Sequence, residues 1–420
     1  MTSVQSRRPA EHPGIGPPQW RALLAAHLGW TLDGMDVMLY AFALTAVKEE
    51  FGIGSAAAGA LASVTLVASA IGGTLAGVLA DRLGRVRVLV YSILVYSLFT
   101  GATATARSPA ELAIWRGLVG LGLGAEWSAG SVLVAETWPA EHRGKAAGLM
   151  QSGWALGYIM AAGLAAVVLP SHGWRPLFVI GILPALLTLW IRRSVPEPEI
   201  WIRSRAAGAR PEDRPAAPRL VALVRPPLRR VMVVATLLTT TVLFAYWGLF
   251  TWIPAYLASP LGSGGAGMGV TGSFASIASM QVGALLGYLS FGALADRFGR
   301  RPVFQIFVGG AALLVLPYAF AARHELLLLG LGALLGFFGH GYFSLFGAML
   351  AELFPSGIRA TAQGICYNAG RALSALAPAT IGALTDRWGH GTALATTAAF
   401  FLAGGILITF LPETRGKELQ

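Results

Sequence analysis

Two carboxylates, Asp33 and Asp36, stand in the first stretch of the chain that is apolar enough to cross a bilayer. They are three residues apart, so on a helix they share a face, and Tyr40 extends that face by one turn. Leaving a charged carboxylate at mid-bilayer costs about 2.5 to 3.5 kcal/mol even on the lenient insertion scale. Both are therefore expected to face a polar cavity, a partner or a proton. The alternative is that they only pair with cations to hold helices together.

Six ionisable residues lie well inside the predicted spans, namely Asp33, Asp36, Arg116, Glu126, His340 and Arg371. Counting from the outer helix ends places Arg116 about 9 Å and Asp36 about 16 Å deep, a gap that an arginine side chain can bridge. The same count places Asp33 and Glu126 nearly level, at about 21 and 24 Å. Two like charges in a low-dielectric site do not both stay ionised, so one of them is expected to hold an exchangeable proton.

In the second half of the chain, Arg371 and His340 each lie about 15 Å from one end of their helices. We assign Arg371 to a substrate carboxylate, because a guanidinium presents a bidentate fork that suits this anion. His340 is either a binding residue or a packed, hydrogen-bonded histidine. The uncharged groups predicted to complete the pocket are Tyr40, Gln151, Trp154, Tyr246, Trp247, Gln281 and Asn368. The side-chain amides of Gln151, Gln281 and Asn368 need hydrogen-bond partners when buried, whereas aromatic residues in such helices more often pack against other side chains.

The chain that carries these residues is 55% hydrophobic and only 12% charged, with a mean hydropathy of +0.63. This excludes an ordinary soluble enzyme and indicates an all-α polytopic membrane protein. The twelve predicted spans are 21–47, 55–80, 88–106, 110–135, 146–169, 176–191, 231–258, 269–295, 303–322, 326–350, 361–385 and 392–411. Each is long enough to cross the roughly 30 Å of bilayer hydrocarbon.

The net charge of +11 does not indicate a nucleic-acid partner, because of where the charges lie. With the N-terminus cytoplasmic, 24 of the 31 Lys and Arg residues fall on the cytoplasmic side, 5 on the opposite side and 2 within spans. This asymmetry predicts that both termini and the central loop are cytoplasmic. The expected location is the cell inner membrane, with the bilayer as a partner.

Self-comparison indicates a duplication. Residues 79–85, Leu-Ala-Asp-Arg-Leu-Gly-Arg, return at 294–300 as Leu-Ala-Asp-Arg-Phe-Gly-Arg, and Pro196-Glu197 returns as Pro412-Glu413. These repeats predict two pseudo-symmetric six-helix bundles in parallel orientation. The predicted domains are a tail at 1–20, a first bundle at 21–191, a cytoplasmic linker at 192–230, a second bundle at 231–411 and a tail at 412–420. The linker could contain a short amphipathic helix around Trp201 to Arg205.

On these motifs the chain resembles the major facilitator superfamily of transporters, which implies alternating access with no cofactor or metal. The loop residues Gly77, Asp81, Arg82, Gly84 and Arg85 match the family's signature. Asp33-Gly34-Met35-Asp36 resembles the Asp-Gly-x-Asp of its aromatic-acid and sialate-type metabolite:proton symporters. The run from Arg116 to Glu126 resembles metabolite and sugar porters. By this resemblance Asp33, Asp36, Arg116 and Glu126 become proton-coupling candidates, with the choice between the two aspartates left open.

The resemblance also implies a charge latch between the cytoplasmic helix ends, which would bias a conformational equilibrium without touching substrate. An exposed ion pair with positive-inside anchoring is the simpler interpretation. The gating candidates are Asp81, Arg82, Arg85, Glu136, Arg143, Asp296, Arg297, Arg300, Glu352 and Arg359.

The leading interpretation is a proton-coupled importer of a small organic anion, aromatic or hydroxylated, acting as a monomer. The closest alternative is a sugar or polyol:proton symporter, for which Arg371 would lose its assigned role. A drug:proton antiporter, which would carry a Gly-Pro pair in the fifth span, and a transporter-like sensor are weaker alternatives. An enzyme is not expected, because no metal spacing, nucleophile elbow or phosphate loop occurs in the sequence.

Overall fold

The computed structural model describes residues 15–206, 226, 228–321, 324–355 and 358–415, and the regular elements among them are helical. The helices of the first half are α1 (Pro17–Phe51), α2 (Ser55–Leu83), α3 (Arg85–Thr103), α4 (Pro109–Thr137), α5 (Ala140–His172), α6 (Arg175–Ile180) and α7 (Pro184–Ser194). Those of the second half are α10 (Leu228–Phe250), α11 (Ile253–Ala258), α12 (Gly269–Phe298), α13 (Arg300–Phe320), α14 (Glu325–Gly341), α15 (Phe343–Glu352), α16 (Arg359–Ser374), α17 (Leu376–Trp388), α18 (His390–Ala395) and α19 (Thr397–Leu407).

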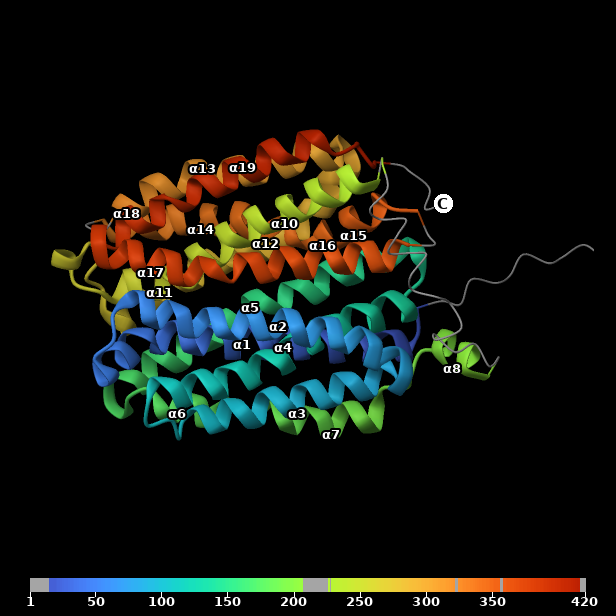
Figure 1. The fold of residues 1–420 in the computed structure, drawn as a ribbon, viewed down its shortest axis with the longest axis horizontal. Helices are drawn as coiled ribbons and strands as arrows, with labels where there is room; N and C mark the ends of the chain where they lie inside the picture. The colour runs from blue at the N-terminus through green and yellow to red at the C-terminus, as the bar shows by residue number, and fades with distance from the viewer. Residues whose placement is uncertain (1–14, 207–225, 227, 322–323, 356–357, 416–420) are drawn as a thin grey trace, which may run out of the picture.

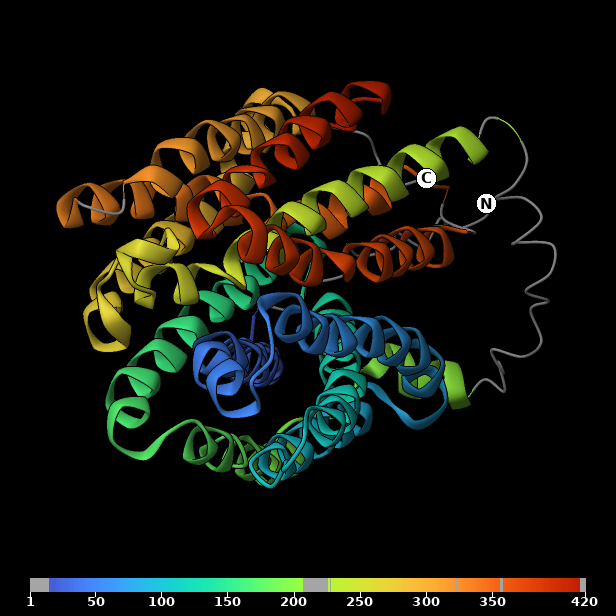
Figure 2. The same ribbon diagram turned by 60° about the vertical axis from the view of Figure 1, so that its left-hand side comes forward.

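In the described residues these helices make twelve crossings, of which α6–α7, α10–α11, α14–α15, α16–α17 and α18–α19 are interrupted ones. Figure 1 shows the second half lying above the first, and the rotated view in Figure 2 keeps the two apart. The predicted all-α fold of two six-helix bundles is therefore confirmed. The domain boundaries in the sequence remain a prediction.

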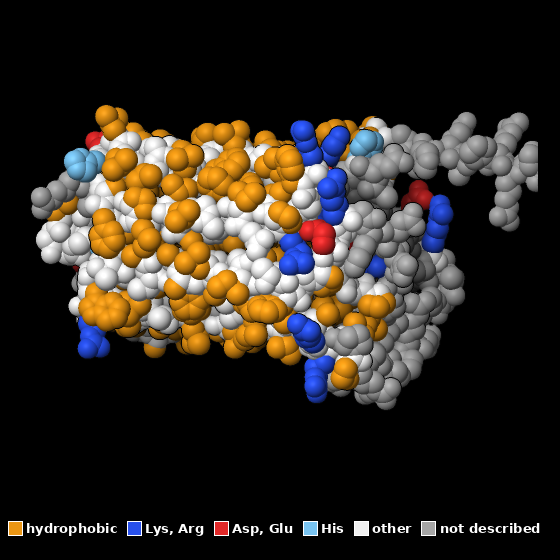
Figure 3. Space-filling model, turned by 90° about the horizontal axis from the view of Figure 1, so that it is seen from above, with side chains coloured by type: hydrophobic (Ala, Val, Ile, Leu, Met, Phe, Trp, Pro, Cys, Tyr) orange, Lys and Arg blue, Asp and Glu red, His pale blue; other side chains and the backbone are white. Residues whose placement is uncertain are grey.

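Nine helical segments of the described chain are long and apolar enough to cross a membrane, by length and composition alone. The other crossings are α1, whose hydropathy Asp33 and Asp36 lower, and the interrupted pairs α14–α15 and α16–α17. On the face that Figure 3 shows, hydrophobic side chains are spread along the length of the molecule, and most of the Lys and Arg side chains in view gather near one end. This distribution is the one expected of a membrane-spanning bundle.

Glycines set the closest helix contacts, and they do so equivalently in both halves. A Cβ on Gly124 of α4 would overlap the backbone of Ser69 in α2, and a Cβ on Gly336 of α14 would overlap the backbone of Met280 in α12. Only residues without side chains permit this approach. Gly124 and Gly336 therefore serve close packing between α2 and α4 and between α12 and α14.

The repeated loop motif forms the same turn twice. Gly84 and Gly299 join α2 to α3 and α12 to α13 with φ of 112° and 105°, a backbone conformation that favours glycine. Glu197 accepts hydrogen bonds from the N–H groups of Val86 and Arg87, so it caps α3. In the second half Glu413 accepts them from Arg300 and Arg301 and caps α13. The Pro-Glu repeat is thus a pair of helix caps supplied by chain distant in sequence.

Interruptions fall beside the predicted binding residues. The helix break between α14 and α15 follows His340 directly, and the break between α16 and α17 comes four residues after Arg371. Pro378 near the start of α17 and Gly341 at the end of α14 provide local causes. Broken helices free backbone groups, and membrane transporters commonly place their substrate sites at such points.

At one end the two halves are joined by a single carboxylate. Asp386, at the C-terminal end of α17, accepts hydrogen bonds of 3.0 Å from the N–H groups of Ser55 and Ala56, the first residues of α2. Next to it, a Cβ on Gly59 would overlap the backbone of Pro378 and a Cβ on Gly382 that of Ser55. The halves are therefore closed against each other at this end, here called the α2–α17 contact.

The short helix predicted near Trp201 is present as α8 (Glu199–Ala206), where Arg203 and Glu199 form an exposed ion pair of 2.7 Å. The rest of the predicted linker around residue 211 lies outside the described residues.

Candidate functional site

Asp33 lies in the middle of the fold between a second carboxylate and a cation. Its carboxyl group interacts electrostatically with Glu126 of α4 and with Arg371 of α16, and Asp33 and Glu126 are essentially buried. Gly29, one turn earlier on α1, leaves the space that Oε1 of Glu126 occupies. Neither oxygen of Glu126 has a hydrogen-bond partner among the described residues. The structure thus brings Asp33 and Glu126 together, as their predicted depths implied.

Asp36 faces a different cation. Its Oδ2 lies 3.6 Å from Nη1 of Arg116, and both side chains are at most 1% exposed. The Oγ1 of Thr100 in α3 donates to Oδ1 of Asp36 at 2.5 Å. The guanidinium of Arg116 lies 5.3 Å above the ring of Tyr40, whose hydroxyl donates to the carbonyl of Ala58. The predicted Asp36–Arg116 pair is present, and Tyr40 has its hydroxyl turned to α2.

Arg371 has an unusual environment for a buried cation. Its side chain is 8% exposed, and it makes no hydrogen bond or ion pair within the described part of the chain. Its electrostatic neighbours are Asp33 and Tyr367, the latter one turn earlier on α16. A guanidinium that is desolvated and unpaired is poised for an anion that is not part of the protein.

His340 sits in an aromatic setting. Its Nδ1 is 3.1 Å from the carbonyl of Gly336, and its ring centroid is 4.1 Å from Phe250 and 5.1 Å from Tyr246. Its Nε2 has no hydrogen-bond partner among the described residues. One ring nitrogen of His340 is thus bonded as in a packed histidine, and the other is available to a ligand.

Several predicted pocket residues present polar atoms that are buried without a partner in the described structure. These are Trp154 Nε1, Tyr246 OH, Trp247 Nε1 and both amide atoms of Gln281. The rings of Trp154 and Trp247 meet edge to face at 5.9 Å across the two halves, and Tyr246 contacts Trp247 at 5.3 Å. Buried polar groups are normally satisfied, so this cluster has the character of a site for a polar ligand or water.

Gln151 and Asn368 are the two remaining predicted residues. The amide of Gln151 on α5 donates to the carbonyl of Phe343 on α15 at 3.4 Å and so joins the two halves. Asn368 is half-buried on α16, next to Tyr367. Among the described residues no group of three or more His, Cys, Asp or Glu side chains is placed to hold a metal ion.

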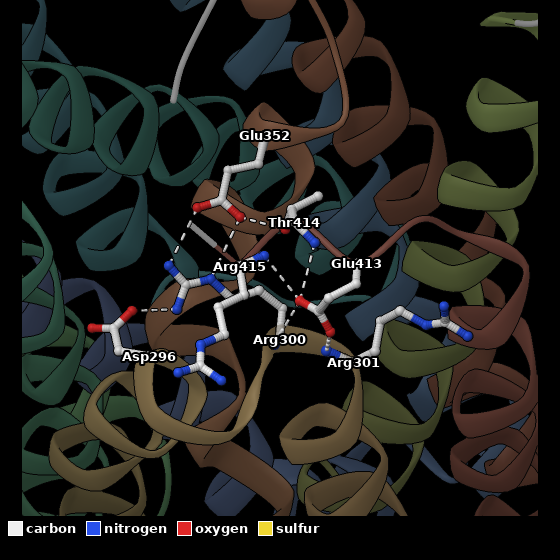
Figure 4. Close-up of polar contacts among 7 residues, drawn as sticks. All are labelled: Asp296, Arg300, Arg301, Glu352, Glu413, Thr414 and Arg415. Atoms are coloured by element: carbon white, nitrogen blue, oxygen red, sulfur yellow. Dashed lines mark hydrogen bonds and ion pairs between the residues drawn. The ribbon is translucent and has the colours of Figure 1, made fainter. Parts of the chain in front are cut away.

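The gating candidates form ion pairs inside each half. Arg85 binds Glu136 with two hydrogen bonds of 2.9 Å, which ties α3 to α4. In the second half Arg300 contacts Glu352 at 3.4 and 3.5 Å and also binds Asp296, as Figure 4 shows. These residues therefore join helix ends within a half.

Other gating candidates differ in their contacts. Thr414 donates to Glu352 at 2.5 Å, Arg297 lies 5.2 Å above the ring of Phe298, and Arg359 donates to the carbonyl of Phe354. Arg82 is exposed and has a further interaction. The side chains of Asp81 and Arg143 lie outside the described residues.

Sequence reasoning missed four residues that the structure places at these sites, namely Thr100, Trp127, Tyr367 and Asp386. Thr100 and Asp386 belong to contacts that only the folded chain reveals. Trp127 and Tyr367 carried a signal, because one adjoins Glu126 and the other precedes Arg371 by one helical turn.

Comparison with known proteins gives the family. Residues 27–291 and 277–420 match the Major Facilitator Superfamily. A cis,cis-muconate transport protein of Acinetobacter baylyi is 35% identical over 416 residues, covering 97% of this chain and 98% of its own. A sialic acid transporter of Escherichia coli is 30% identical over 396 residues, covering 94% of each chain.

Among solved structures, the inward-open xylose transporter of Escherichia coli superimposes with a TM-score of 0.75, covering 96% of this chain and 98% of its own. Its sequence identity is 20%, so this likeness shows the fold alone.

Proposed function

The chain belongs to the Major Facilitator Superfamily, and from this premise we propose that it imports a small organic anion together with protons by alternating access. The family makes it a multi-pass membrane transporter of a small molecule, and not an enzyme. The proposal adds the substrate class, the coupling ion and the residues that bind them.

The observation that carries the proposal is the unpaired guanidinium of Arg371, buried where the two halves face each other. A carboxylate is the anion that its planar fork fits best. Two relatives support the same class, since they are named as transporters of muconate and of sialic acid, both of them acids. The unpaired polar atoms of Trp154, Trp247 and Gln281 would form hydrogen bonds with the substrate's other polar groups.

Asp33 supplies a physical route for coupling substrate to proton. Asp33 lies beside Glu126, and the cation Arg371 nearby favours its ionised form. A substrate carboxylate that binds Arg371 offsets the cation, and Asp33 then favours its protonated form. Because coupling between two ligands is reciprocal, a proton on Asp33 must also favour the bound anion. We therefore assign Asp33 as the proton site and Asp36–Arg116 as the pair that fixes α1 against α4.

The helices that each contact joins indicate whether it holds one half together or holds the two halves against each other. Arg85–Glu136 and Arg300–Glu352 each join helices of one half, so they would keep each half rigid as it moves. The α2–α17 contact joins the halves themselves and must break for that end to open. We propose that residues 21–191 and 231–411 are the two moving bodies.

We further propose that the protein acts as a monomer in the inner membrane with both termini cytoplasmic. The support is the excess of Lys and Arg in the loops assigned to that side.

Uptake by proteoliposomes tests the proposal. Labelled cis,cis-muconate, benzoate and xylose are offered with and without an imposed pH gradient, alkaline inside. We expect at least one acid to accumulate only with the gradient. Gradient-driven accumulation of xylose with no uptake of either acid would instead establish the sugar symporter.

A further inference from the structure

An aromatic pair lies beside Arg371. The rings of Trp127, on α4, and Tyr367, on α16, are stacked with centroids 4.6 Å apart and planes at 14°. The two residues belong to opposite halves of the protein, and both are only half-buried although they lie at its centre. The pair is therefore in direct contact between the two halves and is partly reached by solvent.

The cation stands next to this pair. Arg371 follows Tyr367 by four residues on α16, so the two side chains project from the same face of the helix. The phenol of Tyr367 and the carboxylate of Asp33 are the groups that interact electrostatically with each other and with Arg371. A flat aromatic face and an unpaired guanidinium are thus presented side by side.

Hydrogen-bond donors stand near the pair. Trp30 lies 6.5 Å from Trp127 and 4.9 Å from Trp154, between ring centroids. The indole N–H groups of Trp30 and Trp154 are buried and have no acceptor among the described residues. An indole nitrogen can only donate, so these groups can be satisfied only by an acceptor such as a carboxylate, carbonyl or hydroxyl oxygen.

We propose that Trp127 and Tyr367 form a slot that selects planar, conjugated acids. The rings separate to admit the flat part of the substrate between them, its carboxylate binds Arg371, and a second oxygen accepts from the indoles. This deepens the proposed function and rests on it, since it assumes a carboxylate on Arg371. A flat π-system gains stacking on both faces, whereas a saturated chain or ring of the same charge is thicker and gains none.

Matched pairs of acids test the slot. Benzoate against cyclohexanecarboxylate, and cis,cis-muconate against adipate, differ in planarity but not in charge or carbon number. Each is titrated into the purified full chain, and its dissociation constant is measured by calorimetry. The wild-type protein is expected to prefer the planar member of at least one pair by about 3- to 10-fold, the range that stacking supports.

Trp127→Leu and Tyr367→Leu should each remove that preference, while Trp127→Phe and Tyr367→Phe should keep most of it. Trp115→Leu is the matched control, because Trp115 is on the same helix and is stacked on Phe99 at 6.0 Å within one half. Equal binding of planar and saturated acids by the wild type, or an unchanged preference in both leucine variants, would overturn the slot and leave the carboxylate site standing. If no acid of either pair binds the wild type, the proposed function itself is wrong.

Discussion

Asp36 Oδ2 lies 3.6 Å from Arg116 Nη1 in a part of the protein where neither side chain reaches solvent. Thr100 occupies the other oxygen of Asp36, and the Nε and Nη1 atoms of Arg116 have no hydrogen bond among the described residues. The carboxylate is therefore the main compensation for a buried positive charge. A pair of this kind is costly to break from one side only.

Asp36→Asn should accordingly destabilise the protein by about 3 to 5 kcal/mol, because it leaves Arg116 charged and buried. Asp36→Asn combined with Arg116→Gln should recover most of that loss, since no unpaired charge remains. Thermal unfolding in detergent measures both. If the double variant is as unstable as the single one, the ion pair does not hold α1 against α4.

Asp33→Asn should behave differently, since Asp33 is the assigned proton site. The variant cannot release a proton, so it should lose accumulation driven by a pH gradient and retain exchange of substrate across the membrane. Proteoliposome uptake and counterflow separate the two activities. An Asp33→Asn protein that still concentrates substrate like the parent would move the coupling to Asp36 or elsewhere.

Arg371→Lys should keep the positive charge and lose the planar fork. We expect the affinity for a carboxylate substrate to fall about tenfold or more, and that for a neutral competitor to change much less. Arg387→Lys is a suitable control, because Arg387 adjoins the end of the bundle and not the central site. Unchanged carboxylate affinity in Arg371→Lys would show that the residue is structural.

The sequence predicted the two buried pairs of ionisable residues because depth along a helix follows from residue number. Counting along α1 and α4 placed Asp36 near Arg116 and Asp33 level with Glu126, and the structure has both groupings. Rotation about the helix axis relative to a neighbour is not fixed by that count. Trp127 and Tyr367 were therefore missed, although each stands beside a residue that was found.

The α2–α17 contact was missed for a related reason. Asp386 is separated from Ser55 by 331 residues, and no periodicity in the chain links the end of one helix to the start of another. Interrupted helices also escaped prediction, because hydropathy places residues 361–385 in one span and does not resolve the single-residue break between α16 and α17.

The last prediction concerns pH and the α2–α17 contact. Burial alone would raise the pKa of Asp386, but the hydrogen bonds from Ser55 and Ala56, with Lys48 nearby, outweigh it and lower the pKa below its ordinary value of 3.8. A carboxyl whose pKa is lower in the closed state stabilises closure while it is ionised. Its contribution is thus fully present above about pH 4 and is lost as the pH falls through the lowered pKa.

At neutral pH the same loss should follow from Asp386→Ala, which removes the cap from α2 at a cost of about 1 kcal/mol and so shifts the closed population about fivefold towards the open form. Spin labels at Ala57 and Trp388, exposed residues on α2 and α17, report the separation in a Cys366→Ser background. Glu111→Gln is the matched control, since Glu111 accepts from the N–H of Arg107 within the first half only. An unchanged distance distribution in Asp386→Ala at pH 7 would mean that glycine packing alone, at Gly59 and Gly382, keeps this end closed.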